Sequence, residues 1–277
     1  MVRKELRVRY KGTALGFLWS MLNPLLYLGV FYVVFQLILE AGIPQFPVFL
    51  LSGLLVWNLI SNGLASATGA ITGNSSLVNK VWFPREILPL ASVGATLVHF
   101  FLQGMVLVGV LVVIRYDIAW DYIWLVIPAF IVTVVLTAAL SILLSAANVY
   151  LRDTQHLLEL VLLAWFWLTP IVYQPRFQSD QVAESARLPD WSYLLNPATP
   201  LVLTFQRAIY GRVEVEAVGV IDATRPGAVV MNGILPAGVD QLWYLRNLAI
   251  LGAVALGLLW VAFVVFGRLE GDFAEEL

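Results

Sequence analysis

The sequence contains no cysteine and little charge, because only 12% of its 277 residues are Asp, Glu, Lys or Arg. Without cysteine the chain cannot form a disulfide, a cysteine-ligated zinc site or a thiol nucleophile. About a quarter of the residues in an average soluble domain are charged. Here 60% of the residues are hydrophobic, more than one soluble core of this size could bury. These shortages predict a polytopic membrane protein.

Basic residues do not exceed acidic ones either, and the net charge is −2. That balance excludes a disordered chain and a nucleic-acid-binding protein. The three lysines, Lys4, Lys11 and Lys80, do not follow a glycine-rich phosphate loop, so the chain is not itself a P-loop ATPase. His99 and His156 lack the spacing of a metal site, and there is no nucleophile elbow. We therefore expect no enzyme activity, no metal and no cofactor in this chain.

Long runs without any charged residue define the architecture. A membrane-spanning helix needs about 20 mainly apolar residues, and a charge at its centre is costly. Six charge-free runs meet or approach this length: Gly12–Leu39, Ala41–Asn79, Ile87–Ile114, Tyr122–Leu151, Leu160–Pro175 and Asn247–Gly267. They predict an all-α protein of one domain, 1–277, whose six spans cover 23–39, 46–72, 89–114, 122–149, 157–173 and 242–266.

The positions of the basic residues predict the orientation. Short cytoplasmic loops carry an excess of Lys and Arg. One side of the predicted spans has a single basic residue in its short loops, Arg115, and the other side has nine: Arg3, Lys4, Arg7, Arg9, Lys11, Lys80, Arg85, Arg152 and Arg268. Both termini are therefore predicted to be cytoplasmic, and the long loop 174–241 to be extracytoplasmic.

Residues 3–20 have the pattern of a helix that lies on the membrane surface. Arg7 and Lys11 are spaced by four residues, and Tyr10 falls on an adjacent, more apolar face. Such a helix keeps its cations in water while its apolar face contacts membrane lipids. The alternative is a solvated basic flank. Asn23-Pro24 is expected to form the turn into the first span, because proline suits the start of a helix.

The connection between the second and third spans, 80–88, is unusually apolar for a cytoplasmic turn. Pro84 is expected to open a short helix, and Pro89 the third span. Trp82 and Phe83 precede Pro84, and a plain hydrophilic turn would not contain them. We expect this segment to contact lipid headgroups or a partner protein.

The outer loop has two different halves. Thr199 is expected to cap a helix with Pro200 at its first position and Gly211 at its end. Phe205 and Ile209 lie on the apolar side of that helix, which we expect to pack on the membrane or dip into it. The following segment, 212–240, alternates valine with glutamate and contains turn signals, which indicates an external strand-and-turn insertion.

Aromatic residues are abundant, with 10 Trp, 10 Tyr and 15 Phe. Aromatic residues at span ends usually form belts at the membrane interface. A stripe along a whole span differs from such a belt, and its ring faces would pack against the C–H faces of sugar rings. The first span carries one such stripe and the fifth span a cluster, so we expect a channel lined by Tyr27, Phe31, Phe35, Trp165, Phe166 and Tyr173.

Several segments, in order along the chain, together resemble a known family. They are Arg9–Trp19, Asn79–Pro89, Tyr150–Asp153, Phe166–Tyr173, Asn196-Pro197 and Phe273–Leu277. This pattern is similar to that of the membrane subunits of ATP-binding-cassette polysaccharide exporters, the O-antigen, teichoic-acid and galactan exporter permeases. The resemblance covers nearly the whole chain except 212–240. That insertion is longer than the family pattern, and the chain begins almost at the interface helix, so N-terminal residues of the pattern are expected to be missing.

The resemblance implies a homodimer that forms one continuous channel above two ATPase subunits, which would bind ATP and magnesium. Residues 3–20 would be the interface helix, and Arg152 and Asp153 a second contact with the ATPase. Helices early in the outer loop would form a gate, which matches the stretch with Phe205 and Ile209. The coupling helix, seated in a cleft of the ATPase, would be formed by Lys80, Val81, Trp82, Phe83, Pro84, Arg85 and Glu86.

The function expected on these grounds is export of a lipid-linked polysaccharide across a bacterial inner membrane. One alternative is the permease of an ATP-driven drug or small-lipid exporter, which shares the architecture. A membrane enzyme acting on lipid-linked sugars would need paired carboxylates or a histidine site, and the sequence shows neither. A secondary transporter would need polar or broken helices at mid-membrane, for which Asn58, Asn62 and Gln103 are the only candidates.

Overall fold

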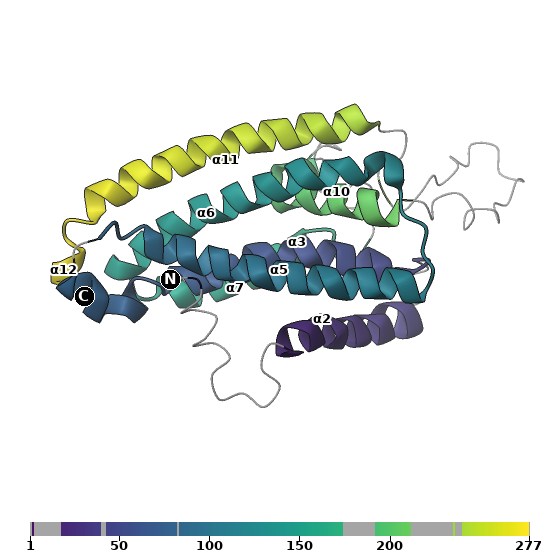
Figure 1. The fold of residues 1–277 in the computed structure, drawn as a ribbon, viewed down its shortest axis with the longest axis horizontal. Coiled ribbons are helices and arrows are strands. Elements are labelled where there is room, and N and C mark those ends of the chain that lie inside the picture. The colour runs from purple at the N-terminus through teal and green to yellow at the C-terminus, as the bar shows by residue number, and fades with distance from the viewer. Residues whose placement is uncertain are drawn as a thin grey trace, which may run out of the picture.

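A computed structural model describes residues 2, 18–39, 43–81, 83–173, 192–211, 235 and 240–276, and the regular elements in these ranges are all helices. The long helices run side by side along the long axis of the molecule (Figure 1). The prediction of an all-α chain is thus confirmed for the part described. The expected surface helix with Arg7, Tyr10 and Lys11, the residue Trp82 and most of the outer loop lie outside it.

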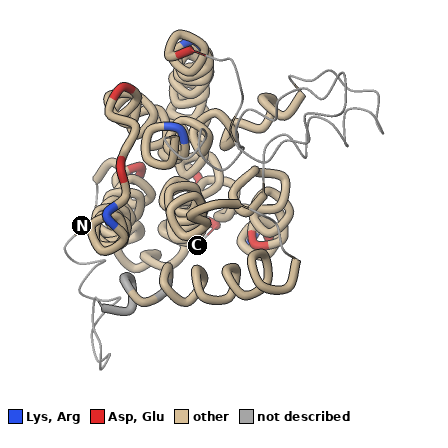
Figure 2. The backbone as a smooth tube through the Cα atoms, turned by 90° about the vertical axis from the view of Figure 1, so that its right-hand side faces the viewer, with Lys and Arg blue, Asp and Glu red and all other residues tan. Residues whose placement is uncertain are grey.

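The helices follow the charge-free runs closely. Charged residues are rare along the long helices, most of whose length is tan in Figure 2. In chain order the elements are α2 (Leu18–Phe31), the π-helix η1 (Tyr32–Ile38), α3 (Phe46–Thr68), the 3₁₀ turn η2 (Thr72–Asn74), α4 (Ser75–Lys80), α5 (Ile87–Val113), η3 (Trp120–Leu125), α6 (Val126–Tyr150), α7 (Thr154–Leu168), η5 (Ser192–Leu195), α10 (Ala198–Tyr210), α11 (Gln241–Leu269) and α12 (Phe273–Glu276).

Four stretches are long and apolar enough to cross a membrane, namely α3, α5, η3 with α6, and α11. Two shorter apolar helices, Pro24–Ile38 and Thr154–Leu168, stand at the positions of the first and fifth predicted spans. Length and composition of the described helices therefore give four candidate spans rather than the six expected.

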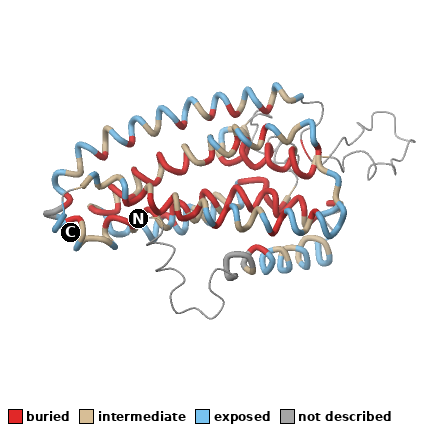
Figure 3. The backbone as a smooth tube through the Cα atoms, viewed as in Figure 1, coloured by how far each residue is buried: buried red, intermediate tan, exposed pale blue. Residues whose placement is uncertain are grey.

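Helix α3 lies at the centre of the bundle, where it packs against α5, α6 and α10. Along its most hydrophobic stretch 78% of the residues are buried within the chain, against 22% for α11 at the periphery (Figure 3). A β-carbon added at Gly63 of α3 would lie 2.5 Å from Cγ2 of Thr137 in α6. Only glycine fits at this crossing, so the close packing of α3 on α6 depends on it.

The turn predicted at Asn23-Pro24 is wrong. The described part of α2 already begins at Leu18, and Pro24 lies inside the helix. Proline has a helical φ, and inside a helix it removes the hydrogen bond of its own nitrogen and crowds the carbonyl four residues before it. Membrane helices tolerate this because neighbouring groups satisfy the freed carbonyl. A proline near the start of an apolar run therefore does not by itself mark where the helix begins.

The fifth helix is shorter than predicted. Helix α7 begins at Thr154, earlier than expected, and ends at Leu168 instead of Tyr173. The next residue, Thr169, is extended, with φ −104° and ψ 132°, as expected for a residue that precedes a proline, here Pro170. With 15 residues, α7 is about 22 Å long, less than the ~30 Å of a bilayer core.

The second predicted span and the helix expected after it also differ in their bounds. Helix α3 ends at Thr68 rather than at residue 72, and the short helix that follows is α4, Ser75–Lys80. Pro84 does not open a helix: residues 83–86 form turns, and α5 begins at Ile87, before Pro89. The helix predicted over 80–88 is therefore wrong, because Val81 already adopts an extended conformation with φ −130° and ψ 130°.

A cluster at one end of the bundle links the C-terminal segment to the connection between α4 and α5. Nη1 of Arg85 donates a hydrogen bond to the carbonyl oxygen of Glu270, and the Tyr150 hydroxyl donates to the carbonyl of Leu269 at 3.0 Å. The buried ring of Phe273 contacts Tyr150 edge-on, with 5.9 Å between ring centroids. The end of the last long helix, the end of α6 and the 83–86 segment thus form one unit.

At the other end of the bundle, α10 is buried within the chain. It packs against α3, η3 and α6, and all its side chains except Arg207 are buried. The prediction that Thr199 caps this helix is wrong, because α10 begins at Ala198, whose amide nitrogen donates to Oδ1 of Asn196 at 3.0 Å. Its end at Gly211 is confirmed.

Candidate functional site

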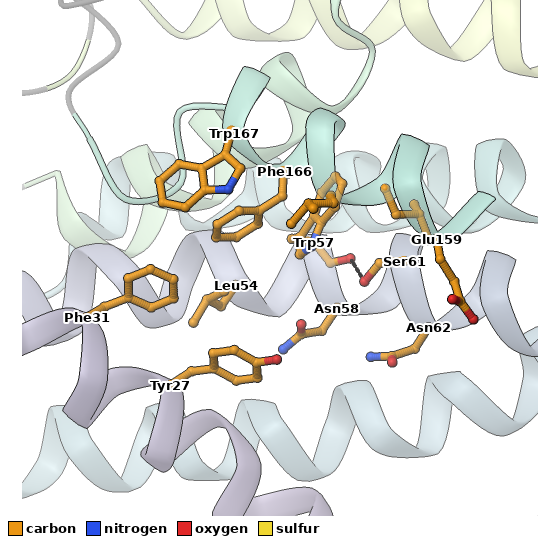
Figure 4. A pocket seen from close by; sticks show the side chains of 12 residues that line it. Tyr27, Phe31, Leu54, Trp57, Asn58, Ser61, Asn62, Glu159, Phe166 and Trp167 are labelled. Carbon is orange, nitrogen blue, oxygen red and sulfur yellow. Dashed lines mark hydrogen bonds between the residues drawn. The ribbon is translucent and has the colours of Figure 1, made fainter. Parts of the chain in front are cut away.

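A pocket of about 430 Å³ lies between α2, α3 and α7 (Figure 4). Each helix contributes the residues of one face, in a pattern that repeats after three or four positions along the chain, so that they line up. These residues are Tyr27 and Phe31 from α2; Leu54, Trp57, Asn58, Ser61 and Asn62 from α3; and Glu159, Leu162, Leu163, Phe166 and Trp167 from α7. The pocket is therefore built from three continuous helix faces.

One end of the pocket is aromatic. Phe31 stacks on Tyr27 with 6.2 Å between ring centroids and lies 5.9 Å from Phe166. Phe166 also packs edge-on against Trp57 at 5.7 Å and Trp167 at 5.4 Å. Tyr27 and Trp167 are half exposed, at 48% and 50%. These rings offer flat apolar surface to a ligand without any charge.

The other end is polar, and Figure 4 shows Asn62 and Glu159 there. Nδ2 of Asn58 donates to Oε1 of Gln103 in α5 at 3.0 Å, which fixes the orientation of the Asn58 amide. The Ser61 hydroxyl donates to the carbonyl of Trp57 at 2.9 Å. Amide and carboxylate groups can exchange hydrogen bonds with hydroxyl groups. Rings at one end and these groups at the other give the pocket the chemistry of a carbohydrate-binding surface.

Of the six rings expected to line a channel, Tyr27, Phe31 and Phe166 line this pocket. Phe35 instead stacks on Phe46, with 6.2 Å between centroids. Tyr173 lies beyond the end of α7, and its hydroxyl donates to the carbonyl oxygen of Trp167 at 2.8 Å.

The sixth ring, Trp165, has a structural role. It packs edge-on against Trp57 at 5.7 Å, and its indole nitrogen donates to Oδ1 of Asn196 at 2.7 Å. Nδ2 of Asn196 donates in turn to the carbonyl of Leu168 at 3.1 Å and to Oγ1 of Thr169 at 2.9 Å. Asn196 therefore holds the end of α7 to the start of α10.

Several lining residues were not predicted from the sequence as site residues: Trp57, Asn58, Asn62, Glu159 and Trp167. The signal was present, because polar and aromatic residues repeat at helical spacing along Leu54–Asn62. It becomes informative only once α3 is known to face α2 and α7.

The residues expected to form the outer gate lie inside the chain's own fold. Phe205 is buried and packs edge-on against Phe100 of α5, with 6.2 Å between centroids. Ile209 is buried as well. Burial of both side chains fixes α10 to the bundle in this conformation.

The residues expected to contact an ATPase divide into two groups. Lys80, Val81 and Pro84 are exposed, and Arg152 and Asp153 are exposed in the turn before α7. Phe83 instead packs against the buried cluster around Phe273, and Glu86, like Arg85, is half-buried. In the part of the chain that the structure describes, no group of three or more metal-ligating side chains could hold a metal ion.

The comparison with known families decides the identity of this bundle. A model of the membrane-embedded ABC-2 type transporter family matches residues 1–210. The chain belongs to the ABC-2 type transporter family. Membership in this family implies a multi-pass membrane protein that works with an ATPase subunit.

Several proteins that this chain resembles have names that refer to polysaccharides. The chain is similar to the O-antigen export system permease protein RfbA of Myxococcus xanthus, at 30% identity over 100% of this chain and 94% of the relative. It is 27% identical to the O-antigen export system permease protein RfbA of Klebsiella pneumoniae, over 100% of this chain and 93% of the relative. A shorter match, 36% identical over 27% of this chain and 30% of the relative, is to the polysialic acid transport protein KpsM of Escherichia coli.

Proposed function

We propose that this chain is one half of a homodimeric channel that exports a lipid-linked polysaccharide across a bacterial inner membrane. Two copies of a separate ATPase subunit supply the energy, and ATP and magnesium bind there. The pocket between α2, α3 and α7 carries this proposal, because its rings and amides suit a sugar chain. Two relatives that match over nearly their whole length are named as permeases of O-antigen export systems, which supports the same class of substrate.

The proposal includes six membrane spans. Helices α2 and η1, of 14 and 7 residues, run without interruption from Leu18 to Ile38, about 30 Å at a helical rise. Helix α7 is shorter and is followed by the bends of residues 169–173, where the Pro170 carbonyl accepts a hydrogen bond from Gln206 of α10. These two helices would complete the set of six together with α3, α5, α6 and α11.

The channel would form where two copies meet. Large apolar side chains on α2 and α7 are exposed in the single chain, among them Leu26, Val30, Leu160 and Leu163. Exposed apolar faces of this kind are covered by lipid or by a partner. A second copy placed against α2 and α7 would close the open pocket into a continuous passage.

The cytoplasmic end would receive the ATPase. The basic residues Lys80, Arg85, Arg152 and Arg268 all stand in segments predicted to be cytoplasmic. Arg85 joins the connection after α3 to the end of α11 through the Glu270 carbonyl. Movement of an ATPase bound at the exposed residues Val81 and Pro84 would reach α11 through this link, as well as α3.

Replacement of the pocket rings tests the proposal in cells that produce the polymer. The double variant Phe31→Ala, Phe166→Ala should lose surface polysaccharide and accumulate lipid-linked polymer inside the cell, because the passage loses its stacking surface. The matched control is Phe263→Ala, which removes an exposed ring of α11 away from the pocket. Normal surface polysaccharide in the double variant, with normal protein levels, would contradict the assignment of the pocket.

A further inference from the structure

Glu159 carries the only charge among the 12 described residues that line the pocket. The other lining residues are aromatic rings, leucines, two asparagines and a serine. Glu159 is exposed, so its carboxylate is available to whatever occupies the pocket.

The helical register places Glu159 on the pocket face of α7. The lining residues of this helix are Glu159, Leu162, Leu163, Phe166 and Trp167, a repeat of three and four positions. The neighbours Leu157 and Leu160 do not belong to this face and do not line the pocket. Figure 4 shows the Glu159 side chain at the same end of the pocket as Asn62. The carboxylate is thus part of the pocket lining, at an exposed position.

The described lining offers this carboxylate no cationic partner. Lysine, arginine and histidine are absent from the 12 described residues around the pocket. Rings and amides carry no net charge, so the described lining itself contributes one negative charge, at the polar end. A negatively charged ligand group about 5 Å away would be repelled. Its occupancy would fall roughly 4-fold at the dielectric constant of water and more than about 100-fold at the lower effective value near a protein.

We infer that Glu159 is a specificity-determining residue that makes this passage select uncharged polysaccharides over acidic ones; this inference rests on the proposed function. Neutral sugar hydroxyls can donate hydrogen bonds to the carboxylate, so the same group that repels an acidic sugar accepts a neutral one. The phosphate of a lipid carrier passes only once per chain, whereas an acidic repeat unit would meet Glu159 at every step. In a homodimer both copies would contribute this charge.

The test uses the complete complex with its ATPase, held open with ATP in a planar bilayer, and measures block of the ionic current by added oligosaccharides. The probes are a neutral malto-oligosaccharide and an acidic oligogalacturonate of equal length. In the wild type the acidic probe should enter about tenfold less often than the neutral one. Glu159→Gln should remove this difference, and Glu159→Lys should reverse it.

Glu276→Gln is the matched control, because it removes the same charge at an exposed position outside the pocket and should keep the wild-type preference. Equal entry of both probes in the wild type, or an unchanged preference in Glu159→Gln, would overturn the role of Glu159 and leave the proposed channel intact. Absence of block by either probe in every variant would contradict the channel itself, and with it this inference.

Discussion

Replacement of Asn196 by alanine should loosen the junction between α7 and α10. Asn196 stands just before α10, and its amide contacts two helix ends at once. Its Oδ1 accepts hydrogen bonds from the nitrogen of Ala198 and from the Trp165 indole, and its Nδ2 donates to Leu168 and Thr169. Alanine can replace none of these contacts.

The size of the effect follows from these four hydrogen bonds, which are 2.7, 3.0, 2.9 and 3.1 Å long. Each such bond contributes about 1 kcal/mol, and a buried group left without its partner costs about 1–3 kcal/mol. The bond to the Leu168 carbonyl is exposed, so its loss leaves no buried group without a partner, and we count about three losses. The expected destabilisation is about 3 kcal/mol, equivalent to a fall in Tm of about 5–10 °C.

The assay is thermal unfolding of the purified protein in detergent, followed by the fluorescence of its tryptophans. Asn62→Ala is the control, because it makes the same chemical change at a half-buried pocket position. Its Tm should stay within about 2 °C of the wild type, as is usual for a substitution away from a network. An equal Tm for Asn196→Ala and the wild type would show that this amide does not join α7 to α10.

Three further predictions concern packing and docking. Gly63→Ala should lower the Tm by several degrees, because the added methyl meets α6 at 2.5 Å, whereas Gly109→Ala, with nothing within 4 Å, should not. Val81→Asp should reduce recovery of the ATPase in co-purification at unchanged Tm, because Val81 is 51% exposed. Phe273→Ala should lower stability by about 3–5 kcal/mol and speed proteolytic removal of the C-terminal segment, because Phe273 is fully buried.

Each of these three predictions would be contradicted by a specific outcome. Equal Tm values for the two glycine variants would show that α3 and α6 do not need their close contact. Full recovery of the ATPase with Val81→Asp would remove this residue from the docking surface. Unchanged proteolysis of Phe273→Ala would show that the ring does not hold the C-terminal segment.

The long helices could be predicted because their cause is local and strong. A charge within a membrane span is so costly that uncharged runs mark the spans, and α3, α5, α6 and α11 lie where such runs predicted them. The errors fall at prolines and caps. The φ of Pro24 suits both the start and the interior of a helix. Only the surrounding structure decides which of the two positions the proline takes. Asn196 rather than Thr199 accepts the hydrogen bond of the first amide of α10, and the same oxygen also accepts from Trp165, a residue distant in sequence.

The candidate site could be predicted in part for the same reason. The stripe of Tyr27 and Phe31 is a property of one helix, visible in its spacing, and it does line the pocket. Trp57 and Asn58 belong to a helix that is apolar on most sides, so its pocket face depends on which helices surround it. Glu159 stands out only when α7 is placed beside α3, since in sequence it resembles any charge near the end of a span.

The proposed transport can be measured as ATP-dependent movement of a lipid-linked polysaccharide in proteoliposomes. The vesicles would contain this chain and its ATPase partner, with the labelled glycan on the ATPase side and a glycan-binding protein on the other. We expect polymer to reach the far side with ATP, and none to do so with a non-hydrolysable analogue or with the chain alone. Active ATP hydrolysis without any movement of polymer, or equal movement without the ATPase, would contradict the proposed transport.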